Sequence, residues 1–178
     1  DFCGVMSFST RATEELQVLP VSQKDKIIET IRRVGYADSG QGGTIFSDAI
    51  SLAGRALSVI TNVERKHIIL VTDGNPGDTY EQYLPYIEEN MADGITMSVV
   101  VVDVDSGVED KMNQTATAGG GKFYGIPEAD LHKLPEIMQQ DIALEVIAEI
   151  EYGNPYNLKI KDRTAAVAGI EEDLIPKL

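Results

Sequence analysis

The pattern of apolar positions is organised around residues 66–74. Four large apolar residues, from Ile68 to Val71, end abruptly in an Asp-Gly turn. This run is too short for a buried helix, so it predicts a strand covered on both faces, which is typical of a parallel sheet. Such sheets bind ligands at the carboxyl ends of their strands, where Asp73 lies. Further strands are predicted at residues 2–8, 13–19, 95–104 and 122–124.

Other segments repeat their apolar residues at helical spacing. Ser22 is a candidate N-cap for the first helix, and Ser106 with Glu109 fits a capping box. Pro135 fits a helix only in its first turn or at a break. Helices are thus predicted at residues 22–35, 47–60, 83–94, 106–118 and 129–150. The resulting order, β-β-α-α-β-α-β-α-β-α, predicts an α/β fold with a doubly wound sheet and helices on both faces.

Length and composition limit the function classes. The chain has 178 residues, 43% of them apolar, which suits one α/β domain over 1–151 and an extension over 152–178. The formal charge of −14 disfavours a nucleic-acid partner and suits a cation or a basic surface. The apolar runs are far shorter than the roughly 20 residues that cross a bilayer, so direct membrane insertion of this chain is not expected.

Motifs of common enzyme classes are incomplete. Gly40–Ile45 lacks the third glycine of a dinucleotide site and follows a loop instead of a strand. Gly119–Phe123 lacks the spacing and the Ser or Thr of a phosphate loop, and its glycines fit a helix stop. The two histidines, His67 and His132, fit structural or exposed positions better than catalytic ones. We therefore do not expect an enzyme.

Four segments keep a common order and spacing, namely Gly4–Ser9, Gly42–Ile50, Ile68–Gly74 and Ala118–Tyr124. Together they resemble successive landmarks of a von Willebrand factor type A domain of the bacterial kind, over about residues 2–150. The resemblance implies a Rossmann-like three-layer sandwich, mostly parallel with one antiparallel edge strand. It also implies a protein-binding module of a bacterial extracytoplasmic or membrane-associated protein.

Members of this family bind a divalent cation at a metal-ion-dependent adhesion site. By resemblance, Thr44 and Asp73 are the loop threonine and loop aspartate of that site. Mg²⁺, or Mn²⁺ or Ca²⁺ in its place, takes hard oxygen ligands, and a protein partner's Asp or Glu then completes the coordination. The alternatives from the residues alone are that Thr44 caps the following helix and that Asp73 caps its own turn.

The sequence departs from the family pattern at one point. No Asp-x-Ser-x-Ser motif occurs, and the chain starts at what resembles the family's second strand. We therefore expect an incomplete metal site and two unpaired strand edges, which a tail strand near Leu158 or a second copy of the chain would cover. The alternative function is a structural or assembly module without a functional metal site. Asp103, Asp105, Glu109 and Asp110 form an acidic stretch without EF-hand spacing, which we interpret as a solvated face.

Overall fold

The computed structural model describes residues 1–34, 43–103 and 106–143, which belong to one compact unit, Asp1–Ala143. The predicted strand at 158–160 and the predicted boundary at 151 lie outside the described residues. The strands are β1 (Phe2–Phe8), β2 (Ala12–Pro20), β3 (Lys66–Thr72), β4 (Ile95–Val102) and β5 (Gly120–Ile126). The helices are η1 (Val21–Gln23), α1 (Lys24–Arg33), α2 (Phe46–Ser58), α3 (Tyr80–Ala92), α4 (Ser106–Ala118), η2 (Glu128–Lys133) and α5 (Leu134–Ile142).

The strands form two sheets. β1 and β2 make an antiparallel hairpin, with Phe8 opposite Ala12 near its turn. β3, β4 and β5 form a parallel sheet in that order, in which β4 is central and pairs along its length with β3. The central position of β4 explains its composition, because a strand buried on both faces carries a nearly continuous apolar run. The predicted α/β fold with a parallel sheet and one antiparallel strand pair is confirmed.

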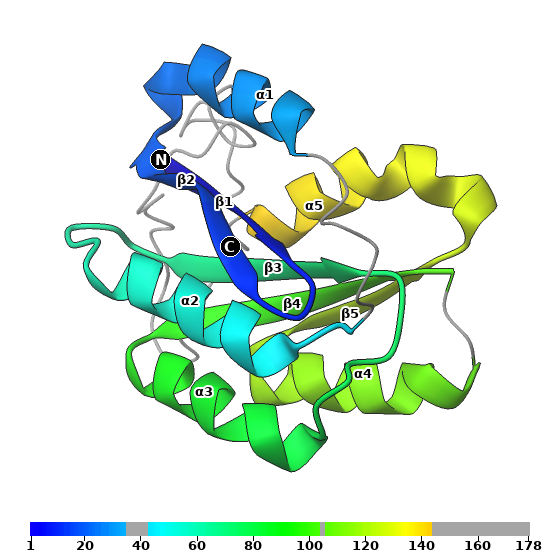
Figure 1. The fold of residues 1–178 in the computed structure, drawn as a ribbon. Helices are drawn as coiled ribbons and strands as arrows, with labels where there is room; N and C mark the ends of the chain where they lie inside the picture. The colour runs from blue at the N-terminus through cyan, green and yellow to red at the C-terminus, as the bar shows by residue number, and fades with distance from the viewer. Residues whose placement is uncertain (35–42, 104–105, 144–178) are drawn as a thin grey trace, which may run out of the picture. The chain divides into compact units, whose positions relative to one another are not determined.

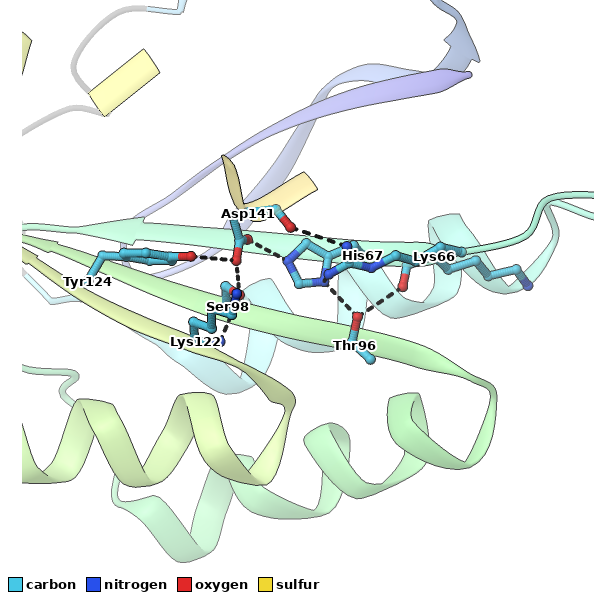
Figure 2. A network of polar contacts seen from close by, with 8 residues as sticks. Lys66, His67, Thr96, Ser98, Lys122, Tyr124 and Asp141 are labelled. Carbon is cyan, nitrogen blue, oxygen red and sulfur yellow. Dashed lines mark hydrogen bonds and ion pairs between the residues drawn. The ribbon is translucent and has the colours of Figure 1, made fainter. Parts of the chain in front are cut away.

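Helices cover both faces of the parallel sheet (Figure 1). The main buried cluster lies between one face and helices α2, α3 and α4, and it includes Phe46, Tyr83, Met97, Val99 and Met112. Helix α5 lies on the opposite face, where Asp141 contacts the sheet (Figure 2). A smaller cluster joins α1 to the hairpin through Leu16, Leu19 and Ile27. The layers therefore follow the period-two alternation of the strands.

The glycines between α4 and β5 have the predicted role. Gly120 has a φ of +66°, a left-handed conformation that L side chains rarely adopt. A Cβ at Gly121 would lie 2.3 Å from the carbonyl oxygen of Met97, so β5 approaches β4 too closely there for a side chain. The helix stop and the sharp turn into the strand thus depend on glycine at these two positions.

Two local predictions were wrong or shifted. Ser22 lies within the 3₁₀ turn η1, and α1 has Gln23 at its N-cap without a side-chain cap. The predicted helix start near 129 is a 3₁₀ segment instead, and α5 begins only at Leu134. Pro135 then lies in the first turn of α5, as its missing N–H requires. The predicted capping box at Ser106 involves a side chain outside the described ones.

The two expected open strand edges, those of β1 and β3, are present, beside the outer edges of β2 and β5. Within the described part of the chain, β1 pairs only with β2, and β3 pairs only with β4. The unpaired edges of β1 and β3 carry backbone donors and acceptors that another strand can use. On α1, Ile28 and Ile31 are 43% and 53% exposed, although their spacing predicted an inward face. Only Ile27 of this apolar set is buried, because the hairpin covers one narrow side of the helix.

Candidate functional site

A cavity of about 400 Å³ opens at the carboxyl end of β3. Both residues that the sequence singled out, Thr44 and Asp73, line this cavity, although 28 residues lie between them in the chain. The structure therefore brings the predicted pair to one site. The remaining wall comes from β1, from the end of β3 and from the end of β4, through Met6, Ser7, Phe8, Val71, Thr72 and Val102.

Asp73 has the environment of an available ligand. Its side chain is exposed, and it makes no hydrogen bond or ion pair with any other described residue. The turn after β3 is instead closed by the hydroxyl of Thr72, which accepts from the backbone N–H of Gly74 at 3.4 Å and donates to its carbonyl oxygen at 3.3 Å. The alternative interpretation of Asp73 as a turn cap is therefore wrong for this structure.

Thr44 is held by its backbone and does not cap α2. Its carbonyl oxygen accepts from the N–H of Gly77 at 2.6 Å, and the next residue, Ile45, donates its N–H to the carbonyl of Ser9 at 2.8 Å. Ile45 is the N-cap of α2 and supplies no side-chain cap. These bonds tie the segment to the β1–β2 turn and to the loop after β3, and Thr44 lines the cavity between them.

The cap of α2 comes from Asp78, a residue that sequence reasoning missed. Its carboxylate is 7% exposed and accepts from the backbone N–H of Phe46 at 3.0 Å and of Ser47 at 2.7 Å. Negative charge at a helix N-terminus also complements the helix dipole. No local signal could identify this cap, because Asp78 lies 32 residues after the helix start that it satisfies.

Asp48, interpreted as favourable charge in the first turn of α2, has an additional contact. Its Oδ2 atom accepts from the backbone N–H of Ala12 at 2.6 Å. This bond connects the start of α2 with the start of β2. Together with the bond from Ile45 to Ser9, it fixes the hairpin turn against the helix and so defines one side of the cavity.

The cavity offers hard oxygen ligands for a metal ion, but few of them. Thr44 and Asp73 offer a hydroxyl and a carboxylate, the oxygen types that Mg²⁺ prefers. Among the described residues, no group of three or more His, Cys, Asp or Glu side chains could hold a metal ion. Of the acidic stretch after β4, Asp103, Glu109 and Asp110 are exposed, as expected of a solvated face, and Asp105 lies outside the described residues.

A second polar group lies on the other face of the sheet (Figure 2). His67 Nδ1 is 2.6 Å from Thr96 Oγ1, and His67 Nε2 is 2.7 Å from Asp141 Oδ2. A hydroxyl, an imidazole and a carboxylate in this order also occur in catalytic triads. Here, however, the side chains of His67 and Asp141 are only 7% and 3% exposed, which leaves a substrate no access to them. We interpret the group as a packing contact.

Burial and hydrogen bonds shift the pKa values of this pair. Burial lowers the pKa of His67, and the hydrogen bond and negative charge of Asp141 only partly oppose this effect. Burial raises the pKa of Asp141, but hydrogen bonds from His67, Ser98 and Tyr124 outweigh it and hold that pKa below its usual value. The pair thus favours neutral His67 and ionised Asp141 at neutral pH.

Solved structures share this fold at low sequence identity. A BatB protein of Bacteroides thetaiotaomicron has 19% identity and a TM-score of 0.65, covering 80% of this chain and 78% of its own. An aerotolerance-related membrane protein of Bacteroides fragilis has 17% identity and a TM-score of 0.61, covering 79% and 78%. Proximal thread matrix protein 1 of the mussel byssus, with a zinc-occupied adhesion-site motif, has 19% identity and a TM-score of 0.61, covering 78% and 35%.

A search of curated protein sequences finds no significant match. In the residues that the structure describes, no helix is both long and apolar enough to span a bilayer. The family model of the von Willebrand factor type A domain matches residues 2–140, which is most of the chain. Members of this family often bind protein partners and metal ions. On this match and on its fold, the chain belongs to the von Willebrand factor type A domain family.

Proposed function

We propose that the chain is a metal-dependent protein-binding module whose site lies at the carboxyl end of β3. Thr44 and Asp73 would hold a divalent cation, Mg²⁺ by preference and otherwise Mn²⁺ or Ca²⁺. When bound, the cation supplies a positive centre that attracts an anionic oxygen of a partner. The observation that carries the proposal is that both side chains line one cavity and that the carboxylate of Asp73 has no other described partner.

The donor set also suggests what the partner contributes. Mg²⁺ needs about six oxygen ligands, and the two proposed ligands, Thr44 and Asp73, supply only part of that set. Waters and an additional carboxylate would fill the remaining positions, so the partner is a protein that presents Asp or Glu. The cavity wall also holds apolar side chains, Met6, Phe8, Val71 and Val102, which would contact the groups beside that carboxylate.

Calorimetric titration of Mn²⁺ into the whole chain tests the metal proposal. The wild type should bind, and Asp73→Ala should lose at least about tenfold in affinity, because it removes the one carboxylate among the described residues that line the cavity. Asp110→Ala, an exposed aspartate of α4 away from the cavity, is the matched control and should bind as the wild type does. Equal affinities in all three proteins would refute the proposal and favour the alternative, a structural or assembly module without a functional metal site.

The open edges of β1 and β3 support a second candidate partner, another copy of this chain. Unpaired edges can pair with another chain, and pairing between copies would satisfy their backbone groups. Size-exclusion chromatography with light scattering at several concentrations tests this. A mass that rises toward the dimer with concentration supports it, whereas a constant monomer mass contradicts it.

We propose an extracytoplasmic or membrane-associated location in a bacterium. The support comes from structural neighbours, among them a membrane protein of Bacteroides fragilis. Catalytic activity is not part of the proposal. The triad-like pair of His67 and Asp141 is buried, and the described residues that line the cavity supply one carboxylate and hydroxyls.

A further inference from the structure

Helix α5 is attached to the sheet through a carboxylate. Asp141 is its only fully buried residue, and the half-buried Leu134, Ile137 and Met138 lie at helical spacing beside it. Its oxygens contact all three strands of the sheet, as Figure 2 shows. Oδ2 lies 2.7 Å from His67 Nε2 of β3, and Oδ1 accepts from Ser98 Oγ of β4 at 2.9 Å and from Tyr124 OH of β5 at 3.0 Å. The fully buried contact of α5 with the sheet is therefore a charged carboxylate with three donors.

Arg65 connects the same histidine to the end of α5. Its Nη1 donates to the backbone carbonyl oxygen of Asp141 at 3.2 Å, and its Nη2 lies 3.3 Å from His67 Nδ1. A guanidinium has only donors, so Nδ1 must be the acceptor. The proton of the neutral ring is then on Nε2, where it is donated to Asp141. Thr96 Oγ1 lies 2.6 Å from the same Nδ1 and 3.4 Å from the carbonyl oxygen of Lys66, so its single hydroxyl hydrogen is shared between these two acceptors.

A second proton on His67 disturbs this arrangement. It would occupy Nδ1, remove the acceptor that Arg65 uses, and set two positive charges side by side. Arg65 is also the residue that holds the carbonyl of Asp141, so its displacement loosens the end of α5. The stronger attraction between charged His67 and Asp141 opposes this, but burial of the ring outweighs that attraction. The docked helix therefore disfavours the proton.

The other groups around the pair do not change this balance. β3 and the residue before it contribute His67 and Arg65, β5 contributes the phenol of Tyr124, and β4 contributes only neutral hydroxyls. Once α5 leaves, His67 regains water and a pKa near the usual value of about 6.5. Protons then bind the undocked form more tightly and shift the equilibrium toward it.

The rest of the domain does not depend on α5 for its core. Neither buried cluster of the described residues contains a residue of this helix. The main cluster lies on the opposite face of the sheet, against α2, α3 and α4. Loss of the contacts of Asp141 can therefore free α5 while the sheet and the other helices keep their packing.

We propose that Asp141 and His67 form a proton-sensitive latch, which holds α5 on the sheet at neutral pH and releases it locally on acidification. The latch lies on the face of the sheet away from the main core, and it stands independently of the metal proposal. The released state would expose the strand face around His67 and free the helix that leads into residues 144–178.

Hydrogen exchange of the whole chain, at about pH 7.5 and about pH 5, spans the usual histidine pKa and tests the latch. Protection factors, which correct for intrinsic exchange, should fall for α5 by about fivefold or more, the size expected when a pKa returns toward its usual value. Those of β4 should fall less. The proposal is overturned if α5 keeps its protection, or if α5 and β4 lose protection together.

Two variants assign the effect to the ring. His67→Gln keeps a side-chain N–H that can donate to Asp141, but the glutamine amide cannot take up a proton. The hydrogen-exchange protection of α5 should therefore no longer depend on pH in this variant. His132→Gln, at an exposed position of η2, is the matched control and should keep the wild-type response. Full pH dependence in His67→Gln would refute the latch. Should that variant not fold, the wild-type exchange data still decide the question.

Discussion

Replacing Asp78 with alanine tests whether a distant carboxylate organises the start of α2. The change removes both oxygens that accept from Phe46 and Ser47, at 3.0 and 2.7 Å, in a site where Asp78 is 7% exposed. The two N–H groups belong to the first turn of the helix, which has no intrahelical partner for them. Ile45, at the N-cap, cannot substitute, because it has no side-chain acceptor.

The magnitude follows from these two bonds. Loss of a helix cap costs about 0.5–2 kcal/mol, and hydrogen bonds to a charged group contribute about 1.5–3 kcal/mol each. Phe46 is buried but Ser47 is only half-buried, so water can offset part of the loss, and we expect Asp78→Ala to lower the free energy of unfolding by about 2–4 kcal/mol. Asp78→Asn keeps one acceptor oxygen without the charge and should cost about half as much.

Urea denaturation followed by circular dichroism measures this. With a slope of about 2 kcal/mol per M, the alanine variant should unfold at a midpoint roughly 1–2 M lower than the wild type. Asp73→Ala is the matched control, since this exposed aspartate has no described partner, and it should change stability by less than about 0.5 kcal/mol. If Asp78→Ala unfolds at the midpoint of Asp73→Ala, the carboxylate does not organise the helix start and our reasoning is wrong.

Three further predictions concern packing and pH. Gly54→Ala should destabilise the domain by about 1–3 kcal/mol in urea denaturation, because the new Cβ would lie 1.8 Å from Oδ1 of Asn90. An unchanged denaturation midpoint would contradict this close contact between the helices. Tyr83→Phe should cost about 1 kcal/mol, since the buried phenol lies 3.0 Å from the hydroxyl of Thr115; a double-mutant cycle with Thr115→Val that shows no coupling would refute the bond. Burial lowers the pKa of His67, so its neutral form contributes stability above about pH 6.5 that is lost as pH falls through the lower folded-state pKa. Thermal melts should therefore show a steeper loss below that pH in the wild type than in His67→Gln.

Local pattern was sufficient for most of the fold. The run from Ile68 to Val71 predicted a buried parallel strand because no partner is needed to recognise apolar residues on both faces. The glycines before β5 predicted a helix stop because their backbone conformation is a local property. Boundaries were less certain where a proline or a 3₁₀ turn competes with the helix, as before Leu134.

The candidate site was predicted only in part. Thr44 and Asp73 were identified through resemblance to a family, and the structure then brought them to one cavity. The cap at Asp78 and the contacts of Asp141 were missed, because they join residues between 17 and 74 positions apart. Thr96 and Ser98 gave a weak signal, since they place hydroxyls at period two on one face of an otherwise apolar strand.

The sequence by itself thus determined the order of the elements and the parallel sheet, and it predicted the end of β3 as the place for a ligand. Periodicity and turn chemistry act over a few residues and are visible without a partner. Only the tertiary structure decided which polar side chains meet, because a hydrogen bond across the fold depends on how distant elements pack. That packing leaves Asp73 exposed and without a described partner at the cavity, and it buries Asp141 among three strands.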